Sequence, residues 1–313
     1  MGWVCPICSS NNEDAEKECI VCGEPYKKMG FDIQAQINNA SGDVRSIIGA
    51  YRTMDLEAEY KEALSLLESD AKGSFEKMLE CASRGYPLAQ NKVGDCYYYG
   101  KGVAQDYSQA LIWFERAARK GVRQAQYNLG FCYYHGYGTV KNPTSAVTWY
   151  KRAAEAGHSG AQNELGDCYY YGAGVAQNFT DAFLWYKKSA DQKNDAGEFN
   201  VGFCYLKGVG VEENKIRAFE YFTLSAAQGN ANAENALGEC YYNGYGVDRD
   251  RRKAIEHYTV AAKRGNASAQ YSLGFCYEKG YGCFPSLAMA REWYRKAAAQ
   301  GHKQAKIALD RLT

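Results

Sequence analysis

The feature that most constrains the fold of this chain is a sequence repeat with a fixed period of 36 residues. Six glycines recur at this interval, and a cysteine follows each of them two positions later: Gly94, Gly130, Gly166, Gly202, Gly238 and Gly274, with Cys96, Cys132, Cys168, Cys204, Cys240 and Cys276. Such a period is typical of arrays in which each repeat is one unit that cannot bury its apolar face alone. The 313-residue chain is therefore expected to be an array of stacked units.

Each unit carries the apolar spacing of two amphipathic helices. In the first complete copy, apolar side chains recur at i, i+4 and i+8 in residues 89–97, and at i, i+3, i+4 and i+7 in residues 110–117. Between them, Gly100-Lys101-Gly102 predicts a helix C-cap and a turn. A glycine inside a helix costs about 1 kcal/mol relative to alanine, so Gly94 predicts that another helix packs there too closely for a Cβ. The expected fold is all-α: a right-handed superhelical solenoid of helix-turn-helix repeats.

These residues resemble the Sel-like repeat (SLR) family, relatives of the tetratricopeptide repeats. The signature Leu-Gly-x-x-Tyr-x-x-Gly-x-Gly-Val, followed by Ala-x-x-Trp-x-x-x-Ala-Ala, recurs six times over about residues 86–301. Lys193 departs from the pattern, because the other units have a glycine there. Family members are adaptor proteins that hold partners in a concave groove. The resemblance therefore implies a non-catalytic protein-protein interaction scaffold.

The chain divides into three regions by composition and motif. Residues 1–28 form a four-cysteine finger, and residues 29–70 are expected to be a hinge followed by one or two capping helices. Residues 71–313 are the repeat solenoid, with a partial second helix before the first complete copy. A lone first helix is expected at residues 303–312, closing the array.

The finger has the ligand spacing of a zinc site. Cys-x2-Cys, ten residues, then Cys-x2-Cys supplies two close thiolate pairs, which tetrahedral zinc requires. A closed shell of four cysteines leaves no open coordination position, so one structural zinc ion is expected. Trp3 and Asn12 fit the register of the Ran-binding-protein type of finger over residues 3–22, and similarity to a plain zinc ribbon explains the same residues equally well. The predicted ligands are Cys5, Cys8, Cys19 and Cys22.

What the finger contacts is left open by its sequence. RNA-binding fingers of this resemblance carry arginines between the second and third cysteines, whereas residues 13–18 hold four acids and one lysine that would repel phosphates. Ubiquitin-binding fingers carry a Thr-Phe pair where this chain has Ser9 and Ser10. A structural knuckle or a protein-docking element is favoured. The alternative function is a reader of ubiquitin or single-stranded RNA that uses the repeats as an assembly arm.

The cysteine pattern, the net charge and the hydrophobicity of the sequence favour a protein of the reducing cytoplasm. The six repeat cysteines have no regular partner and are predicted to be reduced, half-buried apolar residues. Lysine and arginine number 37 against 36 acids, a net charge of +1, which gives no bulk attraction to nucleic acid or an anionic membrane. No secretory signal and no run of 18 apolar residues is present, so a cytoplasmic location without a membrane contact is expected.

One face of each first helix carries a second pattern. Opposite the core stripe, an amide with an acid alternates with an aromatic pair, which gives a period of 72 residues. A side-chain amide can bind a peptide group through its donor and its acceptor, and rings supply rigid contact area. The predicted partner is an extended or helical protein segment with some basic residues; duplication of a two-repeat unit and packing between repeats are the alternatives. The face comprises Asn91, Asp95, Tyr98, Tyr127, Phe131, Tyr134, Asn163, Asp167, Tyr170, Phe199, Phe203, Asn235, Glu239, Tyr242, Tyr271 and Phe275.

No catalytic motif is present in the sequence. The four histidines fall in different repeats and form no metal-binding pair, and neither a P-loop nor a Gly-x-Ser-x-Gly motif occurs. A Ser-x-x-Lys at Ser74 lacks the companion motifs of penicillin-recognising enzymes. We expect no enzymatic activity and no small-molecule substrate.

Overall fold

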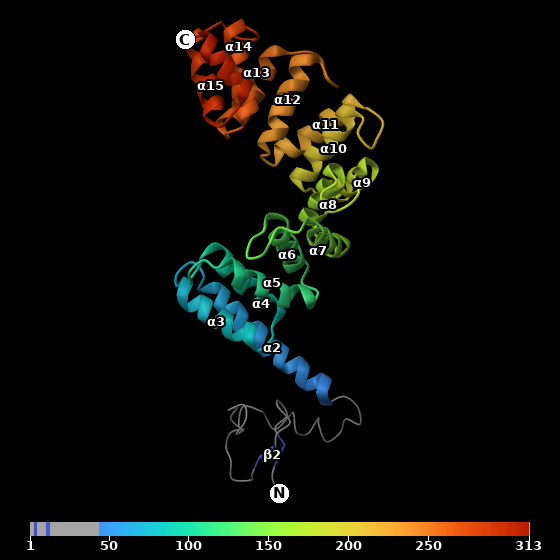
Figure 1. Ribbon diagram of the computed structural model, residues 1–313, viewed down its shortest axis with the longest axis vertical. Coiled ribbons are helices and arrows are strands. Elements are labelled where there is room, and N and C mark those ends of the chain that lie inside the picture. The colour runs from blue at the N-terminus through green and yellow to red at the C-terminus, as the bar shows by residue number, and fades with distance from the viewer. Residues whose placement is uncertain (1–2, 5–10, 13–43, 313) are drawn as a thin grey trace. The chain divides into compact units, whose positions relative to one another are not determined.

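The array is helical throughout, as the sequence predicts (Figure 1). The computed structural model describes residues 3–4, 11–12 and 44–312, with side chains from residue 55 onward. Ahead of the helices, strand β1 (Trp3–Val4) pairs antiparallel with strand β2 (Asn11–Asn12), and Trp3 lies opposite Asn12. The four cysteines predicted to bind zinc lie outside the described residues.

The helices fall into two compact units. The unit that ends at Lys120 holds α2 (Val44–Ser65), α3 (Ala71–Ser83), α4 (Pro87–Tyr99) and α5 (Tyr107–Arg119). The unit that begins at Gly121 holds α6 (Arg123–His135), α7 (Pro143–Glu155), α8 (Ser159–Tyr171), α9 (Phe179–Asp191), α10 (Asp195–Lys207), α11 (Lys215–Ala227), α12 (Ala231–Asn243), α13 (Arg251–Lys263), α14 (Ala267–Lys279), α15 (Leu287–Ala299) and α16 (Lys303–Leu312). The pairs from α4/α5 to α14/α15 are the six predicted repeats, numbered 1 to 6 below.

Helices α2, α3 and α16 lie outside the six repeats, at the ends of the array. Helix α2 is a single helix, and its Leu56 and Ala63 are buried in one cluster with Phe75 and Met78 of α3. Helix α3 is the partial second helix expected before repeat 1, and α16 is the lone first helix expected at the end. In the part of the chain that is described, no helix is long and apolar enough to cross a membrane.

Each second helix begins at a side chain that caps it. The capping residue precedes the helix, and its side-chain oxygen accepts a hydrogen bond from a backbone N–H of the first turn, which would otherwise lack a partner. These residues are Asp106, Asn142, Asn178, Asn214, Asp250 and Ser286. Because an Asx or Ser residue recurs there every 36 residues, the start of each second helix is encoded locally.

The glycine inside each first helix is a point of close contact, as predicted. In repeat 3, a Cβ added at Gly166 would lie 2.5 Å from ring atoms of Tyr186. Tyr186 belongs to α9, the second helix of the same repeat. The ring therefore packs directly on the backbone of the first helix, which explains why the helix carries glycine there.

The six repeat cysteines are more deeply buried than the sequence suggests. The prediction of half-buried residues is wrong, because their side chains are at most 1% exposed. They are free thiols, as expected. Burial raises the pKa of the Cys168 thiol to about 12, so this side chain stays protonated at physiological pH. The repeat cysteines are thus core residues packed among small and aromatic side chains.

Lys193 adopts a backbone conformation that favours glycine. Its φ is 60°, and among the described residues it is the one non-glycine with a positive φ. Gly229 and Gly265 occupy the same place in later repeats with φ of 95° and 92°. We expect Lys193→Gly to raise the free energy of unfolding by about 0.5 to 1 kcal/mol, because the strain of an L-residue in this region is relieved. Urea unfolding checks this, with Gly229→Lys as the reverse substitution; a loss of stability in Lys193→Gly would contradict it.

Candidate functional site

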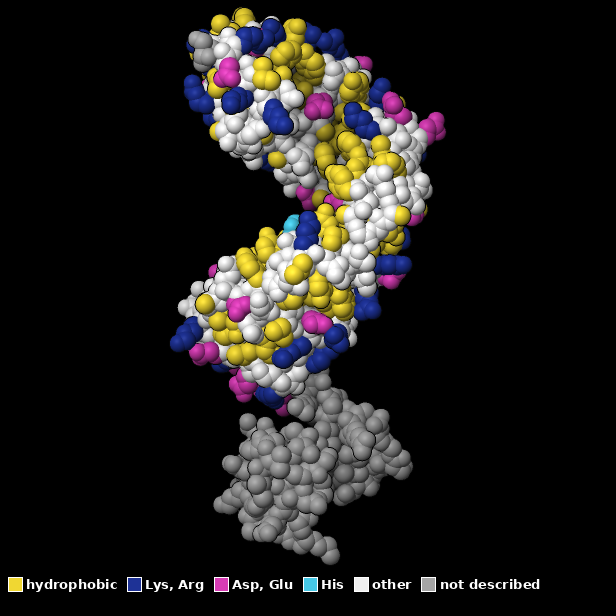
Figure 2. All heavy atoms as spheres, in the orientation of Figure 1, with side chains coloured by type: hydrophobic (Ala, Val, Ile, Leu, Met, Phe, Trp, Pro, Cys, Tyr) yellow, Lys and Arg dark blue, Asp and Glu magenta, His cyan; other side chains and the backbone are white. Residues whose placement is uncertain are grey.

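The face predicted to bind a partner lies on the first helices α4, α6, α8, α10, α12 and α14. Its asparagines are buried: Asn91 and Asn235 are 9% exposed and Asn163 is 6% exposed. Its aromatic residues are partly exposed. Figure 2 shows hydrophobic side chains gathered on the visible face of the second unit. The predicted site is therefore a half-buried surface with aromatic rings at its solvent side and amides beneath.

In repeat 3, the amide and the acid are partly satisfied within the array. Asn163 Oδ1 accepts a hydrogen bond from Asn200 Nδ2 of repeat 4 at 2.9 Å. Asp167 Oδ1 accepts one from the Tyr186 hydroxyl at 2.6 Å. Burial nevertheless raises the pKa of Asp167 above its ordinary value, an effect that this hydrogen bond opposes.

Repeat 5 leaves an amide oxygen without a partner. Asn235 Nδ2 donates to Glu239 Oε1 at 2.8 Å, while Asn235 Oδ1 is buried and accepts no hydrogen bond from the described part of the chain. Repeat 6 has Ser272 in the place that Asn200 holds in repeat 4, and Ser272 forms a side-chain hydrogen bond with Tyr258. Burial raises the pKa of Glu239, opposed by the Asn235 hydrogen bond and by Lys207. A buried acceptor without a partner costs about 1 to 3 kcal/mol.

The aromatic positions contact one another and their neighbours. Tyr170 of α8 meets Phe203 of α10 with ring centroids 6.2 Å apart. Further pairs are Tyr127 stacked on His158 at 4.6 Å, Phe131 against His135 at 4.3 Å, Phe199 against Phe222 at 5.7 Å, Tyr271 stacked on His302 at 4.8 Å and Phe275 against Tyr281 at 5.8 Å. The rings are thus held by packing, which makes them rigid contact surfaces.

Sequence reasoning missed one carboxylate on this surface. Glu164 of α8 lies one turn from Asp167, and burial together with the charge of Asp167 raises the pKa of Glu164 to about 7. The equivalent positions in other repeats are Lys92, Asn128 and Asn200, among others. A comparison of the six repeats at each position identifies Glu164, because only repeat 3 has an acid there; the consensus of the repeats does not show it.

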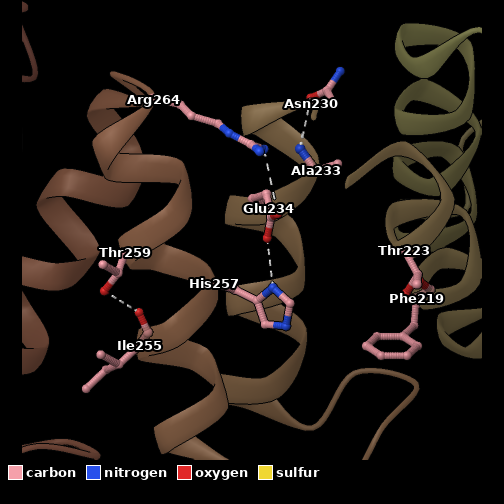
Figure 3. A network of polar contacts seen from close by, with 9 residues as sticks. All are labelled: Phe219, Thr223, Asn230, Ala233, Glu234, Ile255, His257, Thr259 and Arg264. Atoms are coloured by element: carbon pink, nitrogen blue, oxygen red, sulfur yellow. Dashed lines mark hydrogen bonds and ion pairs between the residues drawn. The ribbon is translucent and has the colours of Figure 1, made fainter. Parts of the chain in front are cut away.

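A polar network in repeat 5 is structural. Glu234 of α12 contacts His257 Nδ1 at 2.8 Å and Arg264 at 3.7 Å, both from the second helix or its C-cap (Figure 3). The other repeats have tryptophan or tyrosine where this one has His257. The Thr259 hydroxyl in the same view donates to a carbonyl of its own helix, so it does not join the network. The network cross-links the two helices of the repeat.

Metal-ligating clusters do not occur on this surface. Over the residues that the structure describes, no group of three or more histidine, cysteine, aspartate or glutamate side chains is placed to hold a metal ion. The chemistry that the surface can perform is recognition, by amides, carboxylates and rings.

Comparisons with known proteins identify the repeat. The family model described as Sel1 repeat matches residues 87–122, 123–158, 159–194, 195–230, 231–266 and 267–302. No curated protein matches the chain. A crystal structure of a Sel1 repeat protein from Oxalobacter formigenes is 30% identical, with a TM-score of 0.72, and the match covers 76% of this chain and 96% of that one.

A second solved structure extends the comparison. A protective antigen present in uropathogenic Escherichia coli strains, which displays an SLR fold, is 33% identical with a TM-score of 0.68. The match covers 83% of this chain and 59% of the antigen's chain, so this chain spans less than two thirds of that protein. The family model covers more than half of the chain, and its six matches coincide with the six helix pairs of the structure. The chain therefore belongs to the Sel1 repeat family.

Proposed function

We propose that the protein is a non-catalytic adaptor that binds a segment of a partner protein along the first-helix face of its repeats. Sel1 repeat proteins generally mediate contacts between proteins. The observation that carries the proposal is the Asn235 amide, whose buried oxygen has no hydrogen-bond donor among the residues that the structure describes. A backbone N–H of a bound segment would supply that donor once the neighbouring side chains move aside.

The charges of the face favour a basic segment. Asp167 and Glu239 are half-buried carboxyl groups whose pKa values burial raises, so a positive charge beside them would stabilise their ionised forms. Partly exposed rings such as Tyr170 and Phe203 would contact the side chains of the segment. The partner we propose is an extended or helical segment with some lysine or arginine; nucleic acid is not proposed.

The finger over residues 1–28 is proposed to bind one structural zinc ion through Cys5, Cys8, Cys19 and Cys22. The pairing of β1 with β2 supports this, because Cys5 and Cys8 lie in the short segment that joins the two strands. The alternative function, a finger that reads ubiquitin or single-stranded RNA, makes the finger rather than the repeats the binding element.

Selection of a phage-displayed library of random 16-residue peptides on the full-length protein tests the proposal. We expect selected peptides rich in lysine and arginine. In fluorescence anisotropy, their affinity should fall by about tenfold or more in the triple variant Asn91→Ala, Asn163→Ala, Asn235→Ala, since each lost amide contact is a buried hydrogen bond. Circular dichroism establishes that this variant is folded.

Two control variants locate the binding element. Ile216→Ala with Leu224→Ala changes exposed residues of the second helix α11 and should leave the affinity unchanged. Cys5→Ser with Cys8→Ser removes two predicted zinc ligands and should also leave it unchanged. If the triple variant binds with wild-type affinity, the proposal is wrong; if only the cysteine variant loses binding, the finger is the binding element.

A further inference from the structure

A pair of carboxylates on α8 lacks a basic partner. Glu164 and Asp167 are three residues apart, so they are neighbours on one side of the helix. Neither forms an ion pair with another described residue, and the like charge of Asp167 raises the proton affinity of Glu164. By contrast, Glu278 of α14 contacts both Lys279 and Arg311. The pair in repeat 3 is therefore a half-buried negative site without internal compensation.

Repeat 1 shows the same position with its cation in place. Lys92 occupies in α4 the place that Glu164 occupies in α8, and Lys92 Nζ lies 3.8 Å from Asp95 Oδ2. Asp95 is the equivalent of Asp167. Repeat 3 thus has an acid, Glu164, where repeat 1 has Lys92. The Lys92–Asp95 pair has no net charge, whereas ionised Glu164 and Asp167 together carry two negative charges that an external cation would balance.

A buried hydroxyl beside the pair also lacks a partner. Tyr150 of α7 is 0% exposed, and its hydroxyl makes no hydrogen bond to any described residue. Its equivalents Tyr186 and Tyr294 donate to Asp167 and Glu278. Tyr150 packs in one core cluster with Leu165 and Cys168, which follow Glu164 and Asp167 directly in α8, and the charge of Glu164 raises the pKa of Tyr150 further above the value that burial sets. It offers an oxygen that can accept a hydrogen bond from a bound donor.

Two carboxylates and an accepting hydroxyl suit a guanidinium group. Arginine presents five N–H donors in a plane, pairs with carboxylates through two parallel hydrogen bonds and stacks on aromatic faces. We propose that Glu164, Asp167 and the Tyr150 hydroxyl form the subsite that receives one arginine side chain of the partner segment. This inference rests on the function proposed above and names its anchoring position.

The surroundings of Glu164 make this subsite dependent on pH. The titratable groups that face Glu164 are Asp167 and Cys168 of its own helix, Tyr134 of α6 and Tyr150 of α7. Lys141 lies against the Tyr134 ring, 5.4 Å from its centroid, and forms no ion pair with Glu164 or Asp167. Because burial raises the pKa of Glu164 to about 7, this carboxyl is protonated at pH 5.5 and ionised at pH 8. Arginine binding should weaken by about tenfold at the lower pH.

Amide chemical shifts of the 15N-labelled full-length protein, titrated with N-acetyl-arginine amide, test the subsite directly. We expect saturable shifts in α8 at pH 8 that weaken at pH 5.5. N-acetyl-citrulline amide has nearly the same shape without the charge and should produce none. Glu164→Lys restores the lysine of repeat 1 and should abolish the shifts in a protein at least as stable as the wild type, and Glu155→Gln, an exposed acid of α7, should retain them.

The outcomes separate this inference from the proposed function. Absence of shifts in the wild type at pH 8, equal shifts with citrulline, or unchanged shifts in Glu164→Lys would each overturn the subsite. Arginine-dependent shifts in α8 together with a failed peptide selection would leave the subsite standing and remove the peptide-binding function. Selected peptides that bind, together with no arginine-dependent shift in α8, would support the peptide-binding function and remove the subsite.

Discussion

Replacing Gly246 with alanine is expected to lower the free energy of unfolding of the second unit by about 2 to 5 kcal/mol. Gly246 has a φ of +68°, where an L-residue is strained by about 1 to 2 kcal/mol. An added Cβ would also lie 2.1 Å from the carbonyl oxygen of Lys215, the first residue of α11. Backbone atoms cannot give way as a flexible side chain can, so the overlap must move the loop against the preceding repeat.

A matched glycine separates strain from overlap. Gly265 also has a positive φ, of +92°, but an added Cβ there would meet no atom within 4 Å. Gly265→Ala should therefore cost only the backbone strain, about 1 to 2 kcal/mol. Urea unfolding monitored by circular dichroism measures both variants. Equal losses at the two positions would show that the contact between Gly246 and Lys215 contributes nothing beyond strain.

Replacing Glu164 with glutamine is expected to stabilise the protein at pH 8 more than at pH 5. Burial and the charge of Asp167 raise the pKa of Glu164 from 4.5 to about 7. Between these values the native protein holds a proton that the unfolded chain has released, so stability falls as the pH rises through this window. Above pH 7 the wild type carries the full cost of the buried charge, which glutamine avoids.

The expected difference is about 1 to 3 kcal/mol, because one pKa unit corresponds to about 1.4 kcal/mol and Glu164 is partly exposed. The measurement is the free energy of unfolding of wild type and variant at pH 5 and pH 8. The contributions of the other titrating groups to its pH dependence are common to both proteins and cancel in the difference. Glu155→Gln is the control, since that side chain is 58% exposed and should show no such pH dependence. Parallel pH profiles for wild type and Glu164→Gln would refute the raised pKa.

The helices could be predicted almost completely because their signals are local. The caps of the second helices, such as Asn178, and the glycine that ends each first helix, such as Gly172, are read directly from the sequence. The close contact at Gly166 was also predictable, because a glycine inside a helix requires a reason.

Burial could not be predicted from one helix. A helical wheel places Asn163 opposite the core stripe, yet it is 6% exposed, and Cys168 is fully buried rather than half-buried. Helix α8 packs against α7, α9 and α10, so most of its circumference is covered. The wheel describes a helix with one buried side, whereas a first helix in a stacked array has several.

Glu164 escaped prediction for a different reason. A consensus of six repeats does not show a residue that occurs in one repeat alone. The positions equivalent to Glu164 in the other repeats hold lysine, asparagine, alanine or serine. Its raised pKa depends on depth and on the proximity of Tyr150 and Asp167, which only the folded array determines.

The contact at Gly246 recurs along the second unit. Added Cβ atoms at Gly174, Gly210 and Gly282 would likewise lie within 2.3 Å of the carbonyl oxygen of the first residue in the preceding second helix. These main-chain contacts therefore hold the loop of one repeat against the second helix of the preceding repeat without using the side chains of the face that we propose binds a partner. Substitutions on that face that leave these contacts intact can change which residues of a ligand are accepted while the main-chain contacts between repeats are retained.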